Sequence, residues 1–157
     1  MNNATELRCL RCNSKYRIDR RVSGCPACAE TKPSNLRVVY AESTQNNFHF
    51  ERVPKRGGGL WRYAALLPVS RESVVTLNEG GTPLISVGGL ASHLGLENLY
   101  VKDETRNPTH SYKDRLSTVV ISHARSVGAT VVATASSGNA GSSLAPYAAK
   151  AGIACIV

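Results

Sequence analysis

Long apolar runs are absent from this sequence. No stretch approaches the ~18 consecutive apolar residues that a membrane span needs, and the opening residues, MNNATELRC, lack the basic-then-apolar order of a secretory signal. We therefore expect a cytoplasmic protein without a membrane partner. Aromatic residues are also scarce, at 6 %. Few of them lie among the basic residues, which argues against a surface that stacks nucleic-acid bases.

The remaining composition is that of a folded chain. Of the 157 residues, 42 % are apolar and 19 % are charged, which excludes disordered and collagen-like proteins and suffices for one ordinary core. The net charge of +8 is uneven, because residues 1–75 carry thirteen Lys and Arg against six Asp and Glu. Such a basic half is compatible with nucleic-acid binding, but a solvated face is its more usual meaning.

Four of the five cysteines form two CxxC pairs that are separated by twelve residues. Each CxxC can wrap a tight turn around a metal ion, and two such turns supply the four sulfurs of a tetrahedral site that favours Zn²⁺. We predict a structural zinc ribbon, in which the metal stabilises a segment too polar to form its own core. The predicted metal ligands are Cys9, Cys12, Cys25 and Cys28.

The alternative for these cysteines is a pair of redox sites, but no βαβ pattern surrounds either CxxC. A metal-binding turn often needs a left-handed residue after its second cysteine. Asn13 tolerates that conformation well, whereas Ala29 does so less well. Cys155 stands alone in an apolar run, and we interpret it as a buried small side chain.

The chain divides into three predicted segments. Residues 1–35 form the zinc ribbon, residues 36–75 form connecting strands and a linker, and from residue 76 short apolar runs alternate with helical patterns. This alternation predicts an α/β fold with a parallel sheet. Because parallel strands need cover on both faces, we expect a chain that stops in IACIV to be a fragment. The predicted strands include residues 36–41, 98–104 and 130–135, and residues 46–52 are predicted as a second strand or an extended linker.

Lys113 stands in NPTHSYKDR, directly before an amphipathic helix that Gly128 should end. Ser111 and Asp114 fit a capping box, which places Lys113 in the first helical turn. The helix dipole disfavours a cation there, and so favours the neutral amine that can attack a carbonyl group. A simpler alternative is an ion pair with Asp114 or Glu104. The apolar positions expected to face the core are Leu116, Val119, Val120, His123, Ala124 and Val127.

The stretch SSGNAGSS is a second candidate site, because it joins the buried strand predicted at 130–135 to the helix LAPYAAKAG. Backbone N–H groups of such a loop, at the positive end of a helix, form a cradle suited to a carboxylate. The residues that can offer these groups are Ser137, Gly138, Asn139 and Ala140. An amine nucleophile and a carboxylate cradle in one α/β unit together indicate amino-acid chemistry.

Three stretches carry a family resemblance: LNEGGTPLI, LYVKDETRNPTHSYKDR and ASSGNAGSSLAPYAAKAGI. They closely resemble successive motifs of the threonine synthases, which are fold-type-II (tryptophan synthase β-like) lyases dependent on pyridoxal 5′-phosphate. The resemblance covers residues 77–157 almost continuously and the zinc ribbon, 7–30, loosely. It implies that residues 76–157 are the amino-terminal part of a catalytic domain. The implied reaction converts O-phosphohomoserine and water to threonine and phosphate.

The resemblance also implies roles for single residues. Lys113 matches the lysine that forms a Schiff base with pyridoxal phosphate, and Asn139 matches the asparagine that hydrogen-bonds the cofactor's phenolic oxygen. His110 stands where glycine is usual, and Tyr112 stands where phenylalanine is common, so the substrate is less certain than the cofactor. The loop that would hold the substrate carboxylate comprises Ser136, Ser137, Gly138, Asn139 and Ala140.

Other parts of the resemblance are missing. The family's glycine-rich phosphate cup and the residue facing the pyridine nitrogen have no counterpart here, so we expect the isolated chain to have little activity. Threonine dehydratase, cysteate synthase and diaminopropionate ammonia-lyase share the lysine and the loop, and remain alternatives. A zinc-ribbon adaptor for nucleic acid or protein, with a decayed enzyme remnant, is the alternative from another class. The expected partners are a small amino-acid substrate and a second copy of the chain, rather than nucleic acid.

Overall fold

A computed structural model describes residues 4–19, 23–46, 48–54 and 57–157. Its strands are β1 (Ala4–Cys9), β2 (Lys15–Tyr16), β3 (Leu36–Tyr40), β4 (Leu84–Ser86), β5 (Tyr100–Lys102), β6 (Val131–Ala133) and β7 (Ala154–Ile156). Its α-helices are α1 (Glu42–Asn46), α2 (Gly88–His93), α3 (Asp114–Ser126) and α4 (Asn139–Ala151). Short 3-10 helices lie at Pro26–Cys28, Phe50–Arg52, Gly59–Leu66, Arg71–Ser73 and Glu104–Arg106. None of the described helices is long and apolar enough to cross a membrane.

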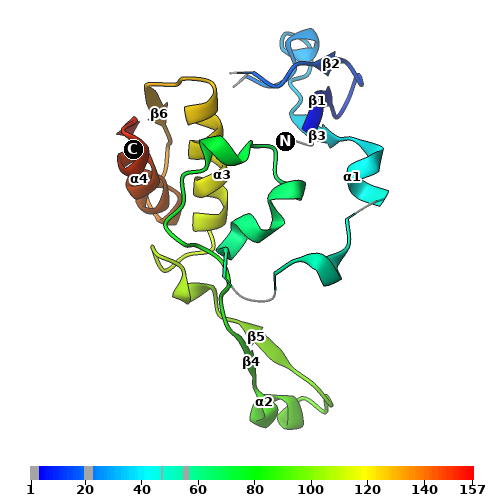
Figure 1. Ribbon diagram of the computed structural model, residues 1–157, viewed down its shortest axis with the longest axis vertical. Coiled ribbons are helices and arrows are strands. Elements are labelled where there is room, and N and C mark those ends of the chain that lie inside the picture. The colour runs from blue at the N-terminus through cyan, green and yellow to red at the C-terminus, as the bar shows by residue number, and fades with distance from the viewer. Residues whose placement is uncertain (1–3, 20–22, 47, 55–56) are drawn as a thin grey trace.

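The amino-terminal module is an antiparallel sheet in the order β2-β1-β3 (Figure 1). The strand predicted at 36–41 is confirmed as β3, and its pairing with β1 places it in the same sheet as the first cysteines. Of the two alternatives for residues 46–52, a strand or an extended linker, the strand is wrong. The helix α1 ends at Asn46, residue 47 lies outside the described residues, and Phe50–Arg52 is a 3-10 helix. Phe48 and Phe50 pack edge-to-face against each other instead of alternating along a strand.

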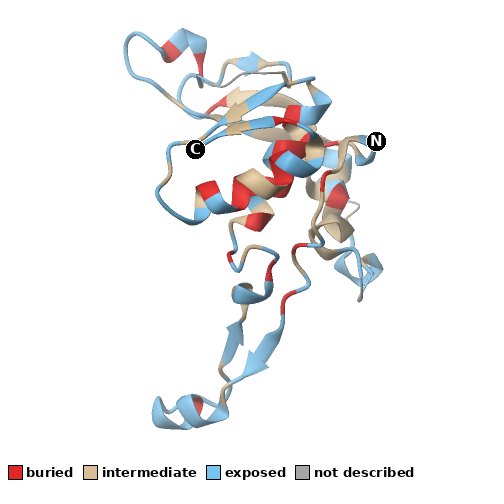
Figure 2. Cartoon of the chain, turned by 90° about the vertical axis from the view of Figure 1, so that its left-hand side faces the viewer, coloured by how far each residue is buried: buried red, intermediate tan, exposed pale blue. Residues whose placement is uncertain are grey.

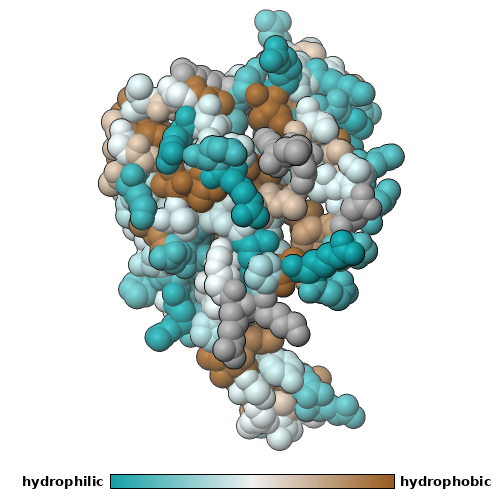
Figure 3. All heavy atoms as spheres, in the orientation of Figure 1, coloured by the Kyte–Doolittle hydropathy of each residue, from teal (hydrophilic) through white to brown (hydrophobic). Residues whose placement is uncertain are grey.

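A narrow arm extends from the body of the molecule, and it consists of β4, α2 and β5 (Figures 1 and 2). Its strands pair antiparallel, with Leu84 opposite Lys102. The strand predicted at 98–104 therefore exists as β5, but its apolar residues do not contribute to a core. Tyr100 and Val101 are 54 % and 45 % exposed, because nothing in the described structure covers this two-stranded arm. Hydrophobic side chains are visible at the base of the arm in Figure 3.

The α/β unit at the carboxyl-terminal end is β6–α4–β7, with β6 and β7 parallel and Val131 opposite Ala154. The predicted parallel pairing is confirmed. The strand predicted at 130–135, which is β6, was expected to be buried, but its Val131 is half exposed. Cys155 in β7 was also expected to be buried and is only partly so. The core lies between α3 and α4 instead (Figure 2). Its buried members are Val75, Ile121, Ala124, Leu144, Tyr147, Ala148 and Ile153.

The buried face of α3 differs from the predicted one. Leu116 and Val120 from the predicted apolar stripe are 55 % and 39 % exposed. The helix instead buries Asp114, Ser117, Thr118, Ile121, Ser122 and Ala124. These small polar side chains can be buried because they have hydrogen-bond partners; the Ser122 hydroxyl, for example, accepts from the Val75 N–H at 2.8 Å. Hydrophobic periodicity therefore predicted the helix correctly and its packed face only in part, since Ala124 is buried as predicted.

Candidate functional site

The turn before α3 positions Lys113. The helix begins at Asp114, so Lys113 is its N-cap residue and lies just before the first helical turn, whereas the predicted capping box made Ser111 the N-cap, two residues earlier. The capping box is also different. The Ser111 hydroxyl accepts from the Lys113 N–H at 3.2 Å, whereas the Asp114 carboxylate accepts from the Thr109 N–H at 2.7 Å and not from Ser111. Lys113 still lies at the amino-terminal end of α3, where the helix dipole is positive.

Neither ion pair that was considered for Lys113 is formed. Glu104 binds Arg115 instead, and Asp114 is fully buried with hydroxyl and N–H partners. Among the described residues, no carboxylate lies within ion-pairing distance of Lys113 Nζ. The amine lies 4.7 Å from the centre of the Tyr112 ring. This position leaves Lys113 available for chemistry.

A hydrogen-bonded cluster around Glu104 joins two of the three stretches that carry the resemblance, residues 77–85 and 99–115. The Arg115 guanidinium donates to both carboxylate oxygens of Glu104, at 2.7 and 2.8 Å. The Thr82 hydroxyl donates to the same carboxylate at 2.6 Å, and the Asn107 amide at 3.0 Å. Asn107 Oδ1 in turn accepts from the Gly80 N–H at 2.9 Å. The cluster therefore anchors the turn that carries Lys113 against the base of the arm.

This cluster predicts a loss of stability in acid. Hydrogen bonds from Arg115 outweigh desolvation and lower the pKa of Glu104 from 4.5 to about 2. A depressed carboxyl pKa contributes stability above its unfolded value, and that stability is lost as the pH falls from about 4.5 towards 2. We expect Arg115→Ala to lower the free energy of unfolding at pH 7 by about 1–2 kcal/mol after solvent screening. The difference from the unchanged protein should shrink below pH about 4.

Urea unfolding at several pH values measures this effect. Arg106→Ala is a matched control, because Arg106 is exposed and has no ion pair among the described residues. A difference between Arg115→Ala and the unchanged protein that stays constant from pH 7 to 2 would contradict the role given to Glu104.

The predicted cradle lies at the start of α4. The helix begins at Asn139, and the Gly138 N–H is already used, because it donates to the Ser136 hydroxyl at 3.2 Å. In the described structure, the N–H groups of Ser137, Asn139 and Ala140 donate to no protein acceptor. Three of the four predicted donors therefore remain available to bind an anion at a positive helix end.

A pocket of about 340 Å³ connects the two candidate sites. Its wall includes Lys102, Glu104, His110, Ser111, Tyr112 and Asn139. Asn139 thus lies on the same pocket as the two residues that precede Lys113. Lys113 itself is not on the wall of this pocket, but its amine lies over the ring of Tyr112, which is. The other four predicted loop residues are not on the wall either. The structure brings Asn139 and the turn before Lys113 to one pocket.

His110 adopts a left-handed backbone, with φ of +58°, which is the conformation that glycine adopts most easily. Its Nδ1 atom lies 3.0 Å from the Thr105 carbonyl oxygen. Because a carbonyl oxygen only accepts, Nδ1 carries the proton in the neutral ring and Nε2 is left as an acceptor. This orientation was not predictable from the sequence.

Glu79 is a buried carboxylate that the sequence analysis missed. It is 0 % exposed and accepts from Trp61 Nε1 at 3.0 Å, the Leu77 N–H at 2.9 Å and the Tyr147 hydroxyl at 2.9 Å. Burial, together with the Glu79 charge, raises the pKa of Tyr147. The backbone also passes closely here, since a Cβ on Gly59 would lie 2.2 Å from the Glu79 carbonyl oxygen. Glu79 therefore fastens the Gly59–Leu66 segment to α4, and only its place in the EGG stretch hinted at a role.

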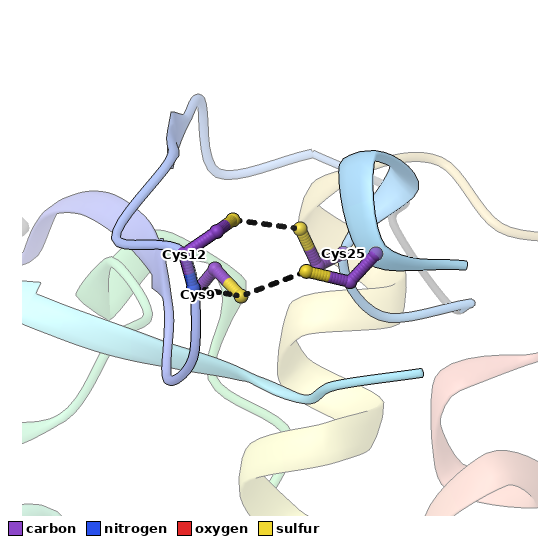
Figure 4. A group of neighbouring side chains, drawn as sticks. Cys9, Cys12 and Cys25 are labelled. Atoms are coloured by element: carbon purple, nitrogen blue, oxygen red, sulfur yellow. Dashed lines mark hydrogen bonds between the residues drawn. The ribbon is translucent and has the colours of Figure 1, made fainter. Parts of the chain in front are cut away.

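The four predicted cysteine ligands converge on one point, and all four sulfurs lie within 4.8 Å of one another. Figure 4 shows the sulfurs of Cys9, Cys12 and Cys25 pointing toward one another. Sulfur pairs are 4.0 Å apart for Cys9 and Cys28 and 3.6 Å apart for Cys12 and Cys25. A tetrahedral site with Zn–S bonds of about 2.3 Å has sulfurs about 3.8 Å apart. The donor set and its spacing therefore fit Zn²⁺.

Backbone donors favour the anionic form of the Cys9 sulfur, whereas burial raises the pKa of the Cys28 thiol to about 12. The N–H groups of Arg11 and Cys12 point at Cys9 Sγ, at 3.3 and 3.4 Å. Burial acts to raise the pKa of Cys9, but these hydrogen bonds outweigh it and lower the pKa to about 6. Asn13 has the predicted left-handed backbone, with φ of +59°, whereas Ala29 is right-handed. The second turn therefore does not carry the penalty that the sequence suggested for Ala29.

Comparison with known proteins identifies the family. The model for the pyridoxal-phosphate dependent enzymes matches residues 75–157, just over half of the chain. The chain belongs to this family. Membership implies pyridoxal phosphate as cofactor and confirms the resemblance drawn from the motifs around Lys113 and Asn139.

Relatives of this pyridoxal-phosphate family member include several threonine synthases. The one from Methanocaldococcus jannaschii is 42 % identical over 152 residues, which cover 96 % of this chain and 36 % of the relative. The one from Methanosarcina acetivorans is 42 % identical over 151 residues, with the same coverage. The one from Halalkalibacterium halodurans is 42 % identical over 101 residues, which cover 64 % of this chain and 28 % of the relative. The chain thus spans about a third of the length of the first two relatives.

Proposed function

We propose that this chain is part of a threonine-synthase-like lyase that converts O-phosphohomoserine and water to threonine and phosphate. The geometry that carries the proposal is the pocket that Asn139 shares with the residues preceding Lys113. Support also comes from the 42 % identity to threonine synthases over 96 % of the chain, which includes the cysteine module. We propose that the enzyme acts in the cytoplasm on a small amino-acid substrate, and as a homo-oligomer.

In this proposal, the residues of the chain bind and orient the reactants. Lys113 holds the cofactor through its amine and moves protons at Nζ. Asn139 hydrogen-bonds the cofactor's phenolic oxygen. The loop 136–140 binds the substrate carboxylate, and the free N–H groups of Ser137, Asn139 and Ala140 are its natural donors. Pyridoxal phosphate, when bound, supplies the electron sink that stabilises negative charge on substrate carbon.

We also propose that Cys9, Cys12, Cys25 and Cys28 hold a structural Zn²⁺. A site with four protein sulfurs has no open position for substrate, so the metal would stabilise the amino-terminal sheet and take no part in the reaction. The proposed domain organisation assigns 1–35 to the zinc ribbon, 36–75 to the connection and 76–157 to the amino-terminal part of the catalytic domain. The pairing of β3 with β1 extends the ribbon's sheet into the connection.

A substrate competition assay tests the proposed reaction. The chain would be assayed alone and joined to the remaining segment of the relative from Methanocaldococcus jannaschii. With O-phosphohomoserine, we expect the joined protein to release phosphate and threonine in equal amounts, because one elimination of phosphate accompanies each addition of water. Lys113→Ala in the same protein is the control. Consumption of threonine, formation of cysteate, or ammonia release from diaminopropionate, without threonine synthesis, would instead favour one of the sibling enzymes.

A further inference from the structure

Asp114 is a buried carboxylate that forms no ion pair with any described residue. It is 0 % exposed. Both of its oxygens are instead held by neutral donors. The Thr109 N–H donates to Oδ2 at 2.7 Å, and the hydroxyl groups of Thr109 and Ser143 donate to Oδ1, the latter at 2.6 Å. Hydrogen bonds to a charged acceptor in a dry site are among the strongest in proteins.

Ser143 connects this carboxylate to the second helix of the site. Its Oγ lies 2.6 Å from Asp114 Oδ1 and 2.7 Å from Ser117 Oγ, and all three side chains are buried. Because a carboxylate only accepts, the Ser143 proton goes to Asp114, and the Ser117 hydroxyl supplies the proton between the two serines. Each hydroxyl thus has one defined role, so α3 and α4 are held in a single relative position.

The two ends of this contact flank the candidate site. Asp114 directly follows Lys113, and Ser143 lies one helical turn after Asn139. On the other side of Asp114, Arg115 is held by Glu104. The backbone after Lys113 is therefore anchored in two directions, toward α4 and toward the base of the arm. A change in the contact between Asp114 and Ser143 would move the Lys113 turn relative to the Asn139 loop.

We propose that Asp114 and Ser143 are positioning residues, whose buried hydrogen bond sets the placement of Lys113 Nζ relative to the cofactor-binding loop at Asn139. This inference rests on the proposed function, because it assigns the contact a role in cofactor capture. A purely structural contact would stabilise the helix pair without affecting how fast Lys113 reacts. The positioning role predicts that breaking the contact slows the reaction of the Lys113 amine at temperatures where every variant is folded. The purely structural role predicts no such change.

The experiment measures covalent labelling of Lys113 in the chain, with pyridoxal phosphate as the probe. Borohydride reduction fixes the label, and peptide mapping gives the rate at Lys113 relative to Lys150, an exposed lysine at the end of α4. We expect Ser143→Ala to slow labelling of Lys113 about tenfold, since sub-ångström misplacement of a reacting group has effects of this order. Ser142→Ala, an exposed neighbour on the same helix, should label at the unchanged rate.

A double-mutant cycle completes the test. Asp114→Asn should slow labelling as Ser143→Ala does, and the double variant should be no slower than the slower single variant, because both changes break one contact. A lower melting temperature for Ser143→Ala with an unchanged labelling ratio would overturn the positioning role and leave the proposed function standing. If the unchanged chain labelled Lys113 no faster than Lys150, the positioning role would fail, whereas the proposed function is tested separately by threonine synthesis in the joined protein.

Discussion

Lys113→Ala is expected to abolish the covalent capture of pyridoxal phosphate and to lower turnover by about 10³-fold or more. Only a primary amine can condense with the cofactor's aldehyde. Lys113 lies beside the pocket, at the positive end of α3, and forms no ion pair in the described structure. Lys102 lines the same pocket, but its ammonium group donates to the Thr82 carbonyl oxygen. No second amine is therefore placed to substitute for Lys113.

Absorbance spectroscopy measures the capture directly, because condensation of the aldehyde with an amine shifts the cofactor's absorption band. Lys150→Ala is the matched control, since it removes an exposed lysine far along α4 and should leave the spectrum unchanged. Peptide mapping after reduction assigns the labelled residue. If the band persisted in Lys113→Ala at its original intensity, the assignment of this lysine would have to be abandoned.

Local signals in the sequence predicted those elements whose partners are close along the chain. The spacing of the cysteines was enough to predict a cluster, because each CxxC closes its own tight turn, and Asn13 indeed has the left-handed backbone. The unit β6–α4–β7 was predicted for the same reason. A parallel pair of strands with a helix between them is contained in fewer than thirty residues, about the usual size of this motif.

The buried polar groups were not predictable in this way. Periodicity shows which face of α3 is apolar, but it does not show which face has a partner. Leu116 lies exposed, while Asp114 is buried because Thr109 and Ser143 satisfy its oxygens. Ser143 is far from Asp114 in the sequence, so the pairing depends on how the two helices pack. The packing of α3 against α4 thus explains both why the buried face of α3 was mispredicted and why Asp114 is proposed as a positioning residue.

The burial of Glu79 was also not predictable, because its hydrogen-bond donors come from distant segments. A single carboxylate in a short turn is usually solvent-exposed. Here it is buried because Trp61, from the segment before it, and Tyr147, from α4 after it, both donate to its oxygens. No pattern within ten residues of Glu79 contains those donors. The candidate site residues were therefore proposed from short motifs, whereas the network around them could be found only in the fold.

Removal of the metal is expected to unfold the amino-terminal sheet. Among the described residues of that module, Cys9, Cys25 and Cys28 form the buried core, and the partly buried hydrophobic side chains packed against them are Tyr16 and Leu36. A core this small cannot stabilise a sheet by apolar burial, whereas binding of structural zinc contributes on the order of 10 kcal/mol. Zinc chelation should therefore increase hydrogen exchange in β1 and β3 by many orders of magnitude, with less effect on the buried helices α3 and α4.

The cysteines offer their own matched control. Cys28→Ser should abolish zinc binding, since a serine hydroxyl is not a ligand for this metal in a four-sulfur site, and Cys155→Ser should leave one zinc per chain. Elemental analysis of the purified proteins gives the metal content, and mass spectrometry reports any disulfide. A metal-free protein in which Cys9 and Cys28 were oxidised to a disulfide would favour the redox interpretation. Zinc lost from both variants would show that the metal lies elsewhere, because Cys155 belongs to β7 and is remote from the cluster in the sequence.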